Sequence, residues 1–372
     1  MPGPAAGSRA PTPAGLADVS AAWLTAALRE GGAAKDLEVA AVRVEPLGEG
    51  VGFLGQLARL HVAYGLSSGG GDGPATLILK LPTDDAGGRE VGRMLGVWAR
   101  ESRFFSHVAP ELAGVAKTPR CYYNGADHEA ERYALLLEDL TPPSRADQLV
   151  GADAAQAAAA VEAIGRVHAR WWGTAHDAFT WMPGFHLPGV RALQHAIEAA
   201  LPAFAEQYAG RVAPETVEWL ARFAPTLSAW IERKAAEPLT LVHADYRLDN
   251  LLFAATGEVA ILDWQTALCG PGAMDLASFC VTSLTTADRR QLEPELFERY
   301  RRALRAGGVE LDAATLTRSY REHLLWWMGI FANNLSRIRP VDERGRAPFD
   351  QTIERTFAAA ADHAVGELLP LA

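Results

Sequence analysis

One stretch in the second half of the chain holds polar residues whose types and spacing suit metal binding and proton transfer. Asp245 and Asn250 lie five residues apart, an apolar run (251–253) follows Asn250, and a second apolar run (259–262) ends at Asp263. If the two runs pair as a hairpin, Asn250 and Asp263 lie side by side at one end. A carboxylate and an amide oxygen there suit Mg²⁺, which usually also takes phosphate oxygens. Asp245 would lie within reach of such a phosphate, where it could orient a hydroxyl group and accept its proton.

The elements that must position these residues change in type along the chain. The first 140 residues contain short β-branched and aliphatic runs bounded by Gly, Asp and Pro, which predict strands over 40–46, 56–64, 76–81, 119–123 and 132–137. One helix is expected near 21–28 and another, beside the sheet, over 90–108. The rest is mainly helical, with helices predicted over 154–172, 190–207, 213–235, 287–306, 313–335 and 349–369. Three short strands, at 239–242, 251–253 and 259–262, interrupt this helical part.

The change of pattern near residues 138–143 divides the chain into two regions of different class. We expect a flexible N-terminal tail (1–16), a small lobe built on an antiparallel sheet with one helix beside it (17–139), and a large, mostly helical lobe (140–372). The predicted fold class is therefore α+β with two lobes. A length of 372 residues fits this division, because single cores rarely grow so large.

Composition excludes whole classes of protein. Apolar residues make up 49% and charged residues 22% of the chain, which is ordinary for a globular protein and argues against disorder. The formal net charge of −10 argues against nucleic-acid binding through a basic surface. No apolar run reaches about 18 residues, so no membrane span is expected. Three cysteines without a CxxC pair indicate reduced thiols, and we therefore expect a cytoplasmic protein.

Short motifs in a fixed order resemble one known superfamily. The run from His243 to Asn250, His-Ala-Asp-x-x-x-x-Asn, is similar to the catalytic loop of the aminoglycoside phosphotransferase and choline kinase superfamily, relatives of protein kinases. Asp263-Trp-Gln stands where protein kinases have Asp-Phe-Gly. Within the superfamily the chain most resembles the ecdysteroid-kinase-like (CHK kinase-like) group, through five further signatures: Lys80-Leu-Pro, Arg100-Glu-Ser-Arg-Phe-Phe, Leu135-Leu-Leu-Glu-Asp-Leu, Val167-His-Ala-Arg-Trp-Trp and Gly270-Pro-Gly-Ala-Met-Asp-Leu. The resemblance implies a protein-kinase-like fold and ATP- and Mg²⁺-dependent phosphotransfer.

The resemblance also implies roles for single residues. Asp245 resembles the catalytic base, and Asn250 and Asp263 resemble the two Mg²⁺ ligands. Lys80 resembles the lysine that holds the α- and β-phosphates, with Glu101 as its partner on the following helix. Lys80 is flanked by leucine and isoleucine, and a buried ammonium group needs a partner. Glu90 is the alternative partner.

Further positions implied by the resemblance lie around the nucleotide and beneath the catalytic loop. The nucleotide loop would use three glycines, and the adenine would bind the backbone of the hinge; these residues are Gly48, Gly50, Gly52, Glu138, Asp139 and Leu140. Asp275 resembles the residue that anchors the catalytic loop. The chain departs from the family at Ala244, where a glycine is usual, and the added methyl group restricts the backbone.

The substrate that receives the phosphate is the least defined part of the prediction. A tryptophan-rich segment on a late helix suggests an apolar acceptor pocket built from Trp326, Trp327 and Phe331, with Asn333 or Asn334, Trp181 and Arg247 as further candidates. Simple core packing of these aromatic residues is the alternative. Residues 323–339 contain no carboxylate, so a hydrophobic alcohol fits better than a polycation.

The sequence thus predicts a small-molecule kinase that phosphorylates a hydroxyl group of a small, fairly hydrophobic molecule, without nucleic-acid or membrane partners. An aminoglycoside-type resistance kinase and a hydroxyacyl-CoA kinase stay open as alternatives, the latter because it shares the run His-x-Asp-Tyr-Arg-Leu-Asp-Asn. A nucleotide-binding pseudokinase is the alternative from another class. The acceptor, the preference for ATP or GTP, and the oligomeric state stay open.

Overall fold

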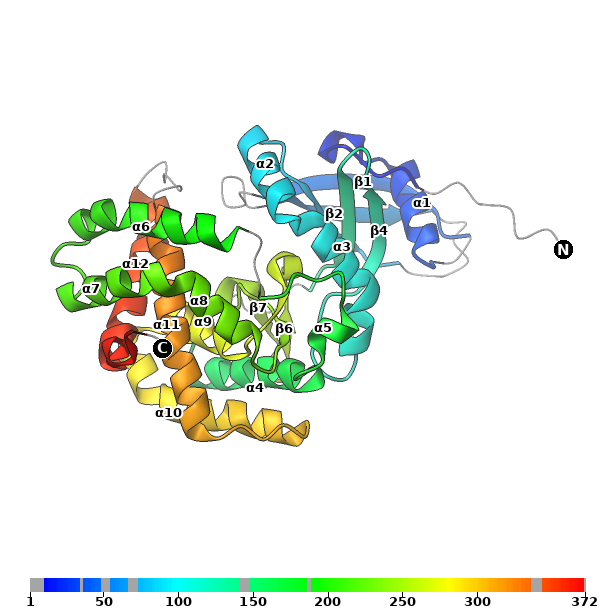
Figure 1. The fold of residues 1–372 in the computed structure, drawn as a ribbon. Coiled ribbons are helices and arrows are strands. Elements are labelled where there is room, and N and C mark those ends of the chain that lie inside the picture. Colours follow the sequence, from blue (N-terminus) through cyan, green and yellow to red (C-terminus); the bar gives the residue numbers. More distant parts are fainter. Residues whose placement is uncertain are drawn as a thin grey trace. The chain divides into compact units, whose positions relative to one another are not determined.

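The computed structural model describes residues 10–33, 36–47, 54–65, 73–140, 147–185, 189–335 and 343–370. The chain forms two compact units (Figure 1). Unit 1 contains Met1–Ala113, Thr118–Pro142 and Leu262–Thr266, and unit 2 contains Gly114–Lys117, Pro143–Ile261 and Ala267–Ala372. The segment that carries Asp263 therefore packs with unit 1, although it follows the catalytic-loop region in sequence.

Unit 1 is built on an antiparallel sheet of five strands in the order β1-β2-β3-β5-β4. The strands are β1 (Val39–Leu47), β2 (Gly55–Tyr64), β3 (Thr76–Pro82), β4 (Cys121–Asp127) and β5 (Arg132–Glu138). Side chains alternate between the two faces of a strand. In β3, Leu77, Leu79 and Leu81 enter the core cluster to which α1 (Ala21–Glu30) also contributes. Lys80 points to the opposite face.

The predicted helix over 90–108 is two helices. Helix α2 (Ala86–Leu95) begins after Asp85, whose carboxylate accepts a hydrogen bond from the backbone N–H of Gly88 at 2.7 Å. It ends at Gly96, which has φ +64°, and α3 (Val97–His107) starts there. A left-handed glycine is a common end for a helix, and here it redirects the chain without ending the helical pattern. The single helix predicted beside the sheet is therefore an underestimate, since unit 1 contains α1, α2 and α3.

Unit 2 is mostly helical, as predicted. Its long helices are α4 (Ala154–Arg170), α6 (Val190–Gln207), α7 (Pro214–Phe223), α8 (Leu227–Ala235), α9 (Ala273–Ser283), α10 (Thr286–Ala306), α11 (Ala313–Leu335) and α12 (Glu343–Asp362), with a four-residue helix α5 (Ala175–Ala178). Four short strands form two antiparallel pairs, β6 (Thr240–Val242) with β9 (Leu268–Gly270) and β7 (Leu251–Phe253) with β8 (Val259–Ile261). The α+β fold class is confirmed.

Besides the short helix α5, helix α9 and strand β9 of unit 2 were not predicted. Every residue of α9 is buried, so the helix has no polar face and shows no amphipathic period in the sequence. Strand β9 is only three residues long, too short for an alternating pattern. Helix α9 carries Asp275, and β9 pairs with β6, the strand that leads into the His243–Asn250 motif.

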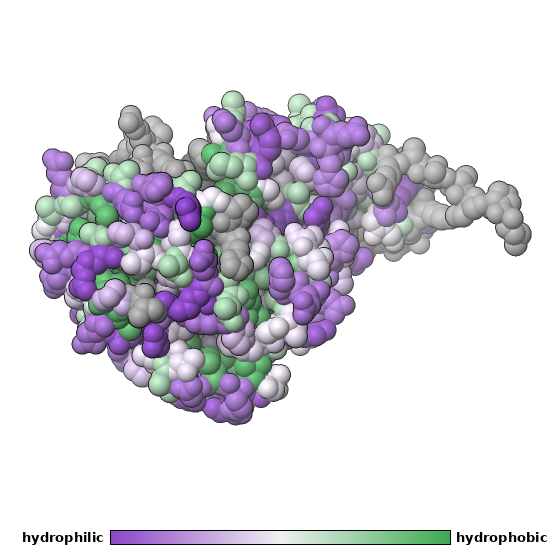
Figure 2. Space-filling model, in the orientation of Figure 1, coloured by the Kyte–Doolittle hydropathy of each residue, from purple (hydrophilic) through white to green (hydrophobic). Residues whose placement is uncertain are grey.

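The surface of the chain carries both polar and apolar residues. The face seen in Figure 2 is largely hydrophilic, with apolar residues in smaller patches between the charged ones. No helix in the described parts of the chain is long and apolar enough to cross a membrane.

Candidate active site

In unit 1, Lys80 lies between two carboxylates. Its Nζ donates a hydrogen bond to Glu101 Oε1 at 2.8 Å and to Asp263 Oδ1 at 2.7 Å. The Lys80 and Glu101 side chains are 11% and 3% exposed, whereas Asp263 is 31% exposed. Glu90, the other predicted partner for Lys80, is exposed to solvent on α2. The structure thus brings Lys80, Glu101 and Asp263 together, with two formal negative charges around one positive charge.

Burial and charge act in opposite directions on this cluster. Burial alone would lower the pKa of Lys80, but the neighbouring carboxylates of Asp263 and Glu101 raise it overall. The Lys80 ammonium group is therefore held in its charged form. Burial raises the pKa of Glu101, while the charge of Lys80 opposes that rise. A fixed cation beside a more exposed carboxylate is an arrangement that can receive both a phosphate group and a metal ion.

Helix α3 holds the segment that carries Asp263. The ring of Phe104 stacks on that of Trp264, with centroids 4.5 Å apart and planes 11° apart. Arg100 Nη1 donates a hydrogen bond to the backbone carbonyl of Gln265 at 3.2 Å. Asp263 itself has φ +59°, a conformation that few non-glycine residues adopt. Contacts from α3 to the two residues that follow Asp263 thus support a strained backbone at a candidate metal ligand.

The predicted hinge residues lie at the end of β5. The backbone N–H of Glu138 donates to the carbonyl of Arg120 at 2.8 Å, and the Glu138 carboxylate accepts from the backbone N–H of Arg120 at 3.0 Å. The Asp139 carboxylate accepts a hydrogen bond from Arg59 Nε at 2.7 Å. Leu140 follows directly. The glycines of the predicted nucleotide loop, Gly48, Gly50 and Gly52, lie outside the described residues.

In unit 2, the carboxylate of Asp275 binds the backbone at the start of the His243–Asn250 motif. This buried carboxylate accepts hydrogen bonds from the backbone N–H groups of His243 at 2.6 Å and Ala244 at 2.8 Å, and it also contacts His168 Nε2 at 3.2 Å. His168 Nδ1 in turn contacts the hydroxyl group of Tyr300 at 2.8 Å. Ala244 has φ +63°, so the alanine found in place of the usual glycine adopts a conformation that favours glycine.

The side chain of Asp245 is held by Asn250 and Arg247 of the same loop. Asn250 Nδ2 donates to the backbone carbonyl of Asp245 at 2.9 Å and to its Oδ2 at 3.0 Å. Arg247 Nε lies 3.2 Å from Asp245 Oδ1. Because the Asn250 nitrogen faces Asp245, its oxygen points elsewhere. Asn250 directly precedes β7, and the β7–β8 pair joins Leu251 to Ile261.

A pocket of about 250 Å³ in unit 2 is lined by Asp245. Its described walls combine the catalytic loop with residues of α9, α11 and α12 and are formed by Gln148, Asp245, Arg247, Ser278, Thr282, Trp327, Phe331, Asn334, Pro348, Phe349, Thr352 and Ile353. The rings of Trp327 and Phe331 are stacked 5.4 Å apart, and Trp327 Nε1 donates to the carbonyl of Met274 at 3.0 Å. The acidic and basic residues of the lining, Asp245 and Arg247, face each other.

The prediction that Trp326 and Trp327 share one pocket needs correction. Trp327 lines the pocket, whereas Trp326 is 3% exposed and packs against Trp230 and Phe185 in the core. Consecutive residues of an α-helix point about 100° apart, so the two rings face different neighbours. Trp181 lies near Phe179 and is not among the described lining residues.

Sequence reasoning missed most of the pocket wall. Gln148, Ser278, Thr282 and the α12 residues carry no motif, and α9 itself was not predicted. Asn334, by contrast, was named as a candidate polar contact and does line the pocket. A weak signal was available in the run from Pro348 to Ile353. The apolar residues Phe349 and Ile353 lie four residues apart, which places them on the same face of a helix.

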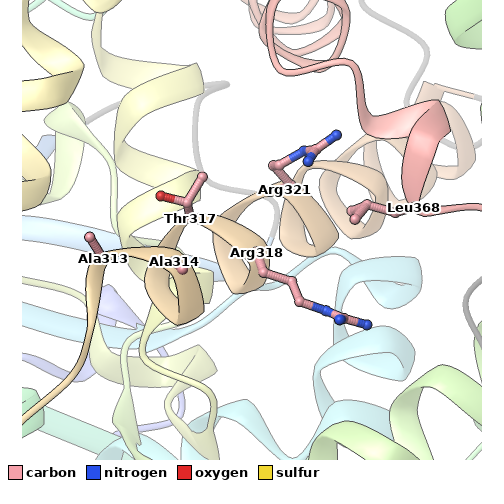
Figure 3. Close-up of a pocket in the computed structure, with 6 residues that line it drawn as sticks. All are labelled: Ala313, Ala314, Thr317, Arg318, Arg321 and Leu368. Atoms are coloured by element: carbon pink, nitrogen blue, oxygen red, sulfur yellow. The ribbon is translucent and has the colours of Figure 1, made fainter.

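A second pocket lies at the start of α11, away from these motifs in sequence. It is lined by Ala313, Ala314, Thr317, Arg318, Arg321 and Leu368 (Figure 3). Its two arginines are engaged in ion pairs, Arg318 with Glu322 at 3.1 Å and Arg321 with Glu367 at 2.9 Å. No residue predicted for catalysis lines it, so the acceptor is not placed there.

The sequence profile of the Ecdysteroid kinase-like family matches residues 49–311, which is more than half of the chain. The chain belongs to this family. A search of curated proteins found no match. The predicted relationship to the aminoglycoside phosphotransferase and choline kinase superfamily is therefore confirmed, and the chain is a small-molecule kinase-like phosphotransferase.

Solved structures share the fold at low sequence identity. Choline kinase from Cryptosporidium parvum Iowa II has a TM-score of 0.54 and 11% identity, over 89% of this chain and 92% of that chain. A Ralstonia eutropha JMP134 protein named as an aminoglycoside phosphotransferase has a TM-score of 0.50 and 18% identity, over 90% of this chain and 97% of that chain. These similarities show the fold alone.

Proposed function

We propose that the chain transfers the γ-phosphate of ATP, in a Mg²⁺-dependent reaction, to a hydroxyl group of a small, uncharged and largely apolar molecule. The observation that carries the proposal is the position of Asp245. This carboxylate lines an apolar-walled pocket and is oriented by Asn250 and Arg247. A base at the wall of a substrate-sized pocket is what transfer to a hydroxyl group requires.

The nucleotide is assigned to residues of unit 1. Lys80, charged and oriented by Glu101, would contact the α- and β-phosphates. Gly48, Gly50 and Gly52 would bring backbone N–H groups close to the phosphates, and the backbone of Glu138, Asp139 and Leu140 would contact the adenine. The Glu138 N–H donates to the carbonyl of Arg120, so this N–H is not the donor to the adenine.

Asp263 and Asn250 are proposed as the magnesium ligands. Asp263 is the more exposed carboxylate beside Lys80, and the Asn250 amide presents its oxygen away from Asp245. Within the described ranges no three His, Cys, Asp or Glu side chains cluster as a metal cage. A site with two protein oxygen ligands completed by phosphate oxygens and water is typical of Mg²⁺ in phosphotransferases. When bound, the ion would neutralise charge that develops on the phosphates.

In the proposed reaction, Asp245 accepts a hydrogen bond from the acceptor hydroxyl group and aligns its oxygen with the γ-phosphorus. As the new O–P bond forms and the bond to the β-phosphate oxygen breaks, the hydroxyl proton passes to the Asp245 carboxylate and ADP leaves. Lys80 stabilises the negative charge that builds up on the leaving phosphates.

The chemistry of the pocket favours an uncharged acceptor. Its one described acidic residue, Asp245, is paired with Arg247 at 3.2 Å, so little negative charge is left for a polycation such as an aminoglycoside. The stacked rings of Trp327 and Phe331, together with Phe349 and Ile353, provide an apolar surface. Such walls bind the body of a hydrophobic alcohol, while a few polar groups fix its orientation.

A screen with labelled ATP tests this proposal. Purified chain, Mg²⁺ and γ-labelled ATP are incubated with sterol-like alcohols, macrolides, nucleosides, aminoglycosides and hydroxyacyl-CoA thioesters, and labelled products are separated. We expect transfer to an apolar, uncharged alcohol, and we expect Trp327→Ala to raise the KM for that alcohol on the order of tenfold without changing the KM for ATP. Preferred transfer to an aminoglycoside or a hydroxyacyl-CoA would refute the acceptor class. Nucleotide binding without any transfer would support a pseudokinase.

The cellular setting is also a proposal. Cys121, Cys269 and Cys280 are free thiols, with Cys269 and Cys280 buried. Reduced cysteines and the proposed use of ATP are consistent with a cytoplasmic enzyme that acts on a small molecule. We propose no nucleic-acid or membrane partner.

A further inference from the structure

Helix α12, which forms part of the acceptor pocket, is linked to the catalytic carboxylate by hydrogen bonds and one ion pair. This link starts at Arg355 on α12, a helix that lies outside the region matched by the family profile. It passes through the segment that carries Gln148 and through Arg247 to Asp245. All of these residues belong to unit 2.

Arg355 is an unusual residue for its surroundings. It is 5% exposed, and burial lowers its pKa. Its guanidinium group donates hydrogen bonds to three backbone carbonyl oxygens, those of Gln148 at 3.0 Å, Leu149 at 2.9 Å and Thr282 at 3.2 Å. Burying a cation is costly unless it is hydrogen-bonded, and these three carbonyl groups meet that requirement. The contacts that Arg355 makes fix the backbone of the Gln148–Leu149 segment to α12.

The Gln148 side chain continues the link. Its Oε1 accepts a hydrogen bond from Arg247 Nη1 at 2.9 Å, and the same nitrogen lies 2.7 Å from Asp249 Oδ2. Arg247 is thereby held at its outer edge, while its Nε lies 3.2 Å from Asp245 Oδ1. A guanidinium group is planar and rigid, so fixing one edge orients the other.

The last step sets the orientation of Asp245. Asn250 engages Oδ2, and Arg247 engages Oδ1, so the two contacts together define the plane of the carboxylate. Each carboxylate oxygen has a further lone pair, which can face a hydroxyl group. If Arg247 moves, Oδ1 loses this contact, and the carboxylate can turn about its χ2 torsion. A small misplacement of a reacting group lowers turnover strongly.

We propose that Arg355 and Gln148 are positioning residues that fix Asp245 through Arg247, and that α12 thereby joins acceptor binding to the alignment of the base. Since α12 also contributes Pro348, Phe349, Thr352 and Ile353 to the pocket, an acceptor that packs against it stabilises the same helix that anchors the link. This inference rests on the proposed function.

The test uses the full chain with Mg-ATP, and water as the acceptor, so it does not depend on knowing the natural substrate. Hydrolysis of labelled ATP is measured for Arg355→Met, Gln148→Leu and the double variant, together with KM for ATP and the thermal unfolding midpoint. We expect each single variant to lower kcat on the order of tenfold with an unchanged KM, and the double variant to be no slower than the slower single variant. We also expect Arg355→Lys to recover part of the loss.

Arg290→Met is the matched control. Arg290 also bonds to α12, through Asp362 at 2.8 Å, but near the end of the helix farthest in sequence from the pocket residues. Its kcat should equal that of the unsubstituted chain. The link would be overturned if Gln148→Leu had the kcat of the unsubstituted chain. It would also be overturned if the decreases in kcat of the two single variants multiplied in the double variant. An unsubstituted chain that hydrolyses no ATP and phosphorylates nothing in the acceptor screen would instead overturn the proposed function.

Discussion

A substitution at Ala244 is the simplest test of backbone strain in the catalytic loop. Ala244 has φ +63°, and its N–H is bonded to the buried carboxylate of Asp275 at 2.8 Å. In the left-handed region the Cβ of a non-glycine residue costs roughly 1–2 kcal/mol. We therefore predict that Ala244→Gly stabilises the chain, although glycine is usually destabilising.

The expected magnitude follows from two opposing effects. Removing the Cβ relieves the left-handed strain, whereas the more flexible glycine costs about 0.5–1 kcal/mol of backbone entropy on folding. The net result is an increase of about 0.5–1 kcal/mol in the free energy of unfolding. Ala199→Gly is the control, because Ala199 is exposed in the middle of α6 and should lose about 1 kcal/mol.

Urea unfolding followed by tryptophan fluorescence measures both variants. Both positions belong to unit 2, so their effects are compared on the unfolding of the same unit. The midpoints should move in opposite directions, to higher urea for Ala244→Gly and to lower urea for Ala199→Gly. ATP hydrolysis by Ala244→Gly should stay within about twofold, because Asp275 still bonds both backbone N–H groups. A loss of stability in Ala244→Gly equal to that of the control would refute left-handed strain at this position.

Two further predictions concern a buried histidine and the metal site. Burial lowers the pKa of His323 to about 3, so on acidification the unfolded chain takes up a proton below about pH 6.5 that the native chain does not. Stability is thus lost as pH falls, and between pH 8 and 5 the unsubstituted chain should lose about 2 kcal/mol more than His323→Phe in urea titrations; parallel pH curves would contradict this. Asp263→Ala should weaken Mg²⁺-dependent ATP binding on the order of tenfold or more by calorimetry, and an unchanged affinity would argue against a metal role.

Much of the fold could be predicted because its elements follow simple periods. Helix α11 has the predicted bounds, and β7 with β8 forms the predicted hairpin. Helix α11 shows a helical repeat, whereas β7 and β8 are short apolar runs whose ends are marked by polar or turn residues. The family could be predicted because several short motifs occur in a fixed order, although each alone is weak.

The parts that could not be predicted depend on tertiary surroundings. Helix α9 is buried on all sides and leaves no periodic trace. The difference between Trp326 in the core and Trp327 at the pocket depends on which neighbours surround α11, not on the residues themselves. The link from Arg355 to Asp245 runs through backbone carbonyl groups, and these carry no side-chain signature in a sequence.

The central claim is that Asp245 is the base of a phosphotransfer reaction, and one variant tests it most directly. Single-turnover transfer from labelled ATP to the acceptor identified in the screen is measured for the unsubstituted chain and for Asp245→Ala, with ATP affinity measured in parallel. We predict transfer slower by a factor on the order of 10² or more, with ATP affinity nearly unchanged. Transfer at the unsubstituted rate by Asp245→Ala would contradict the account.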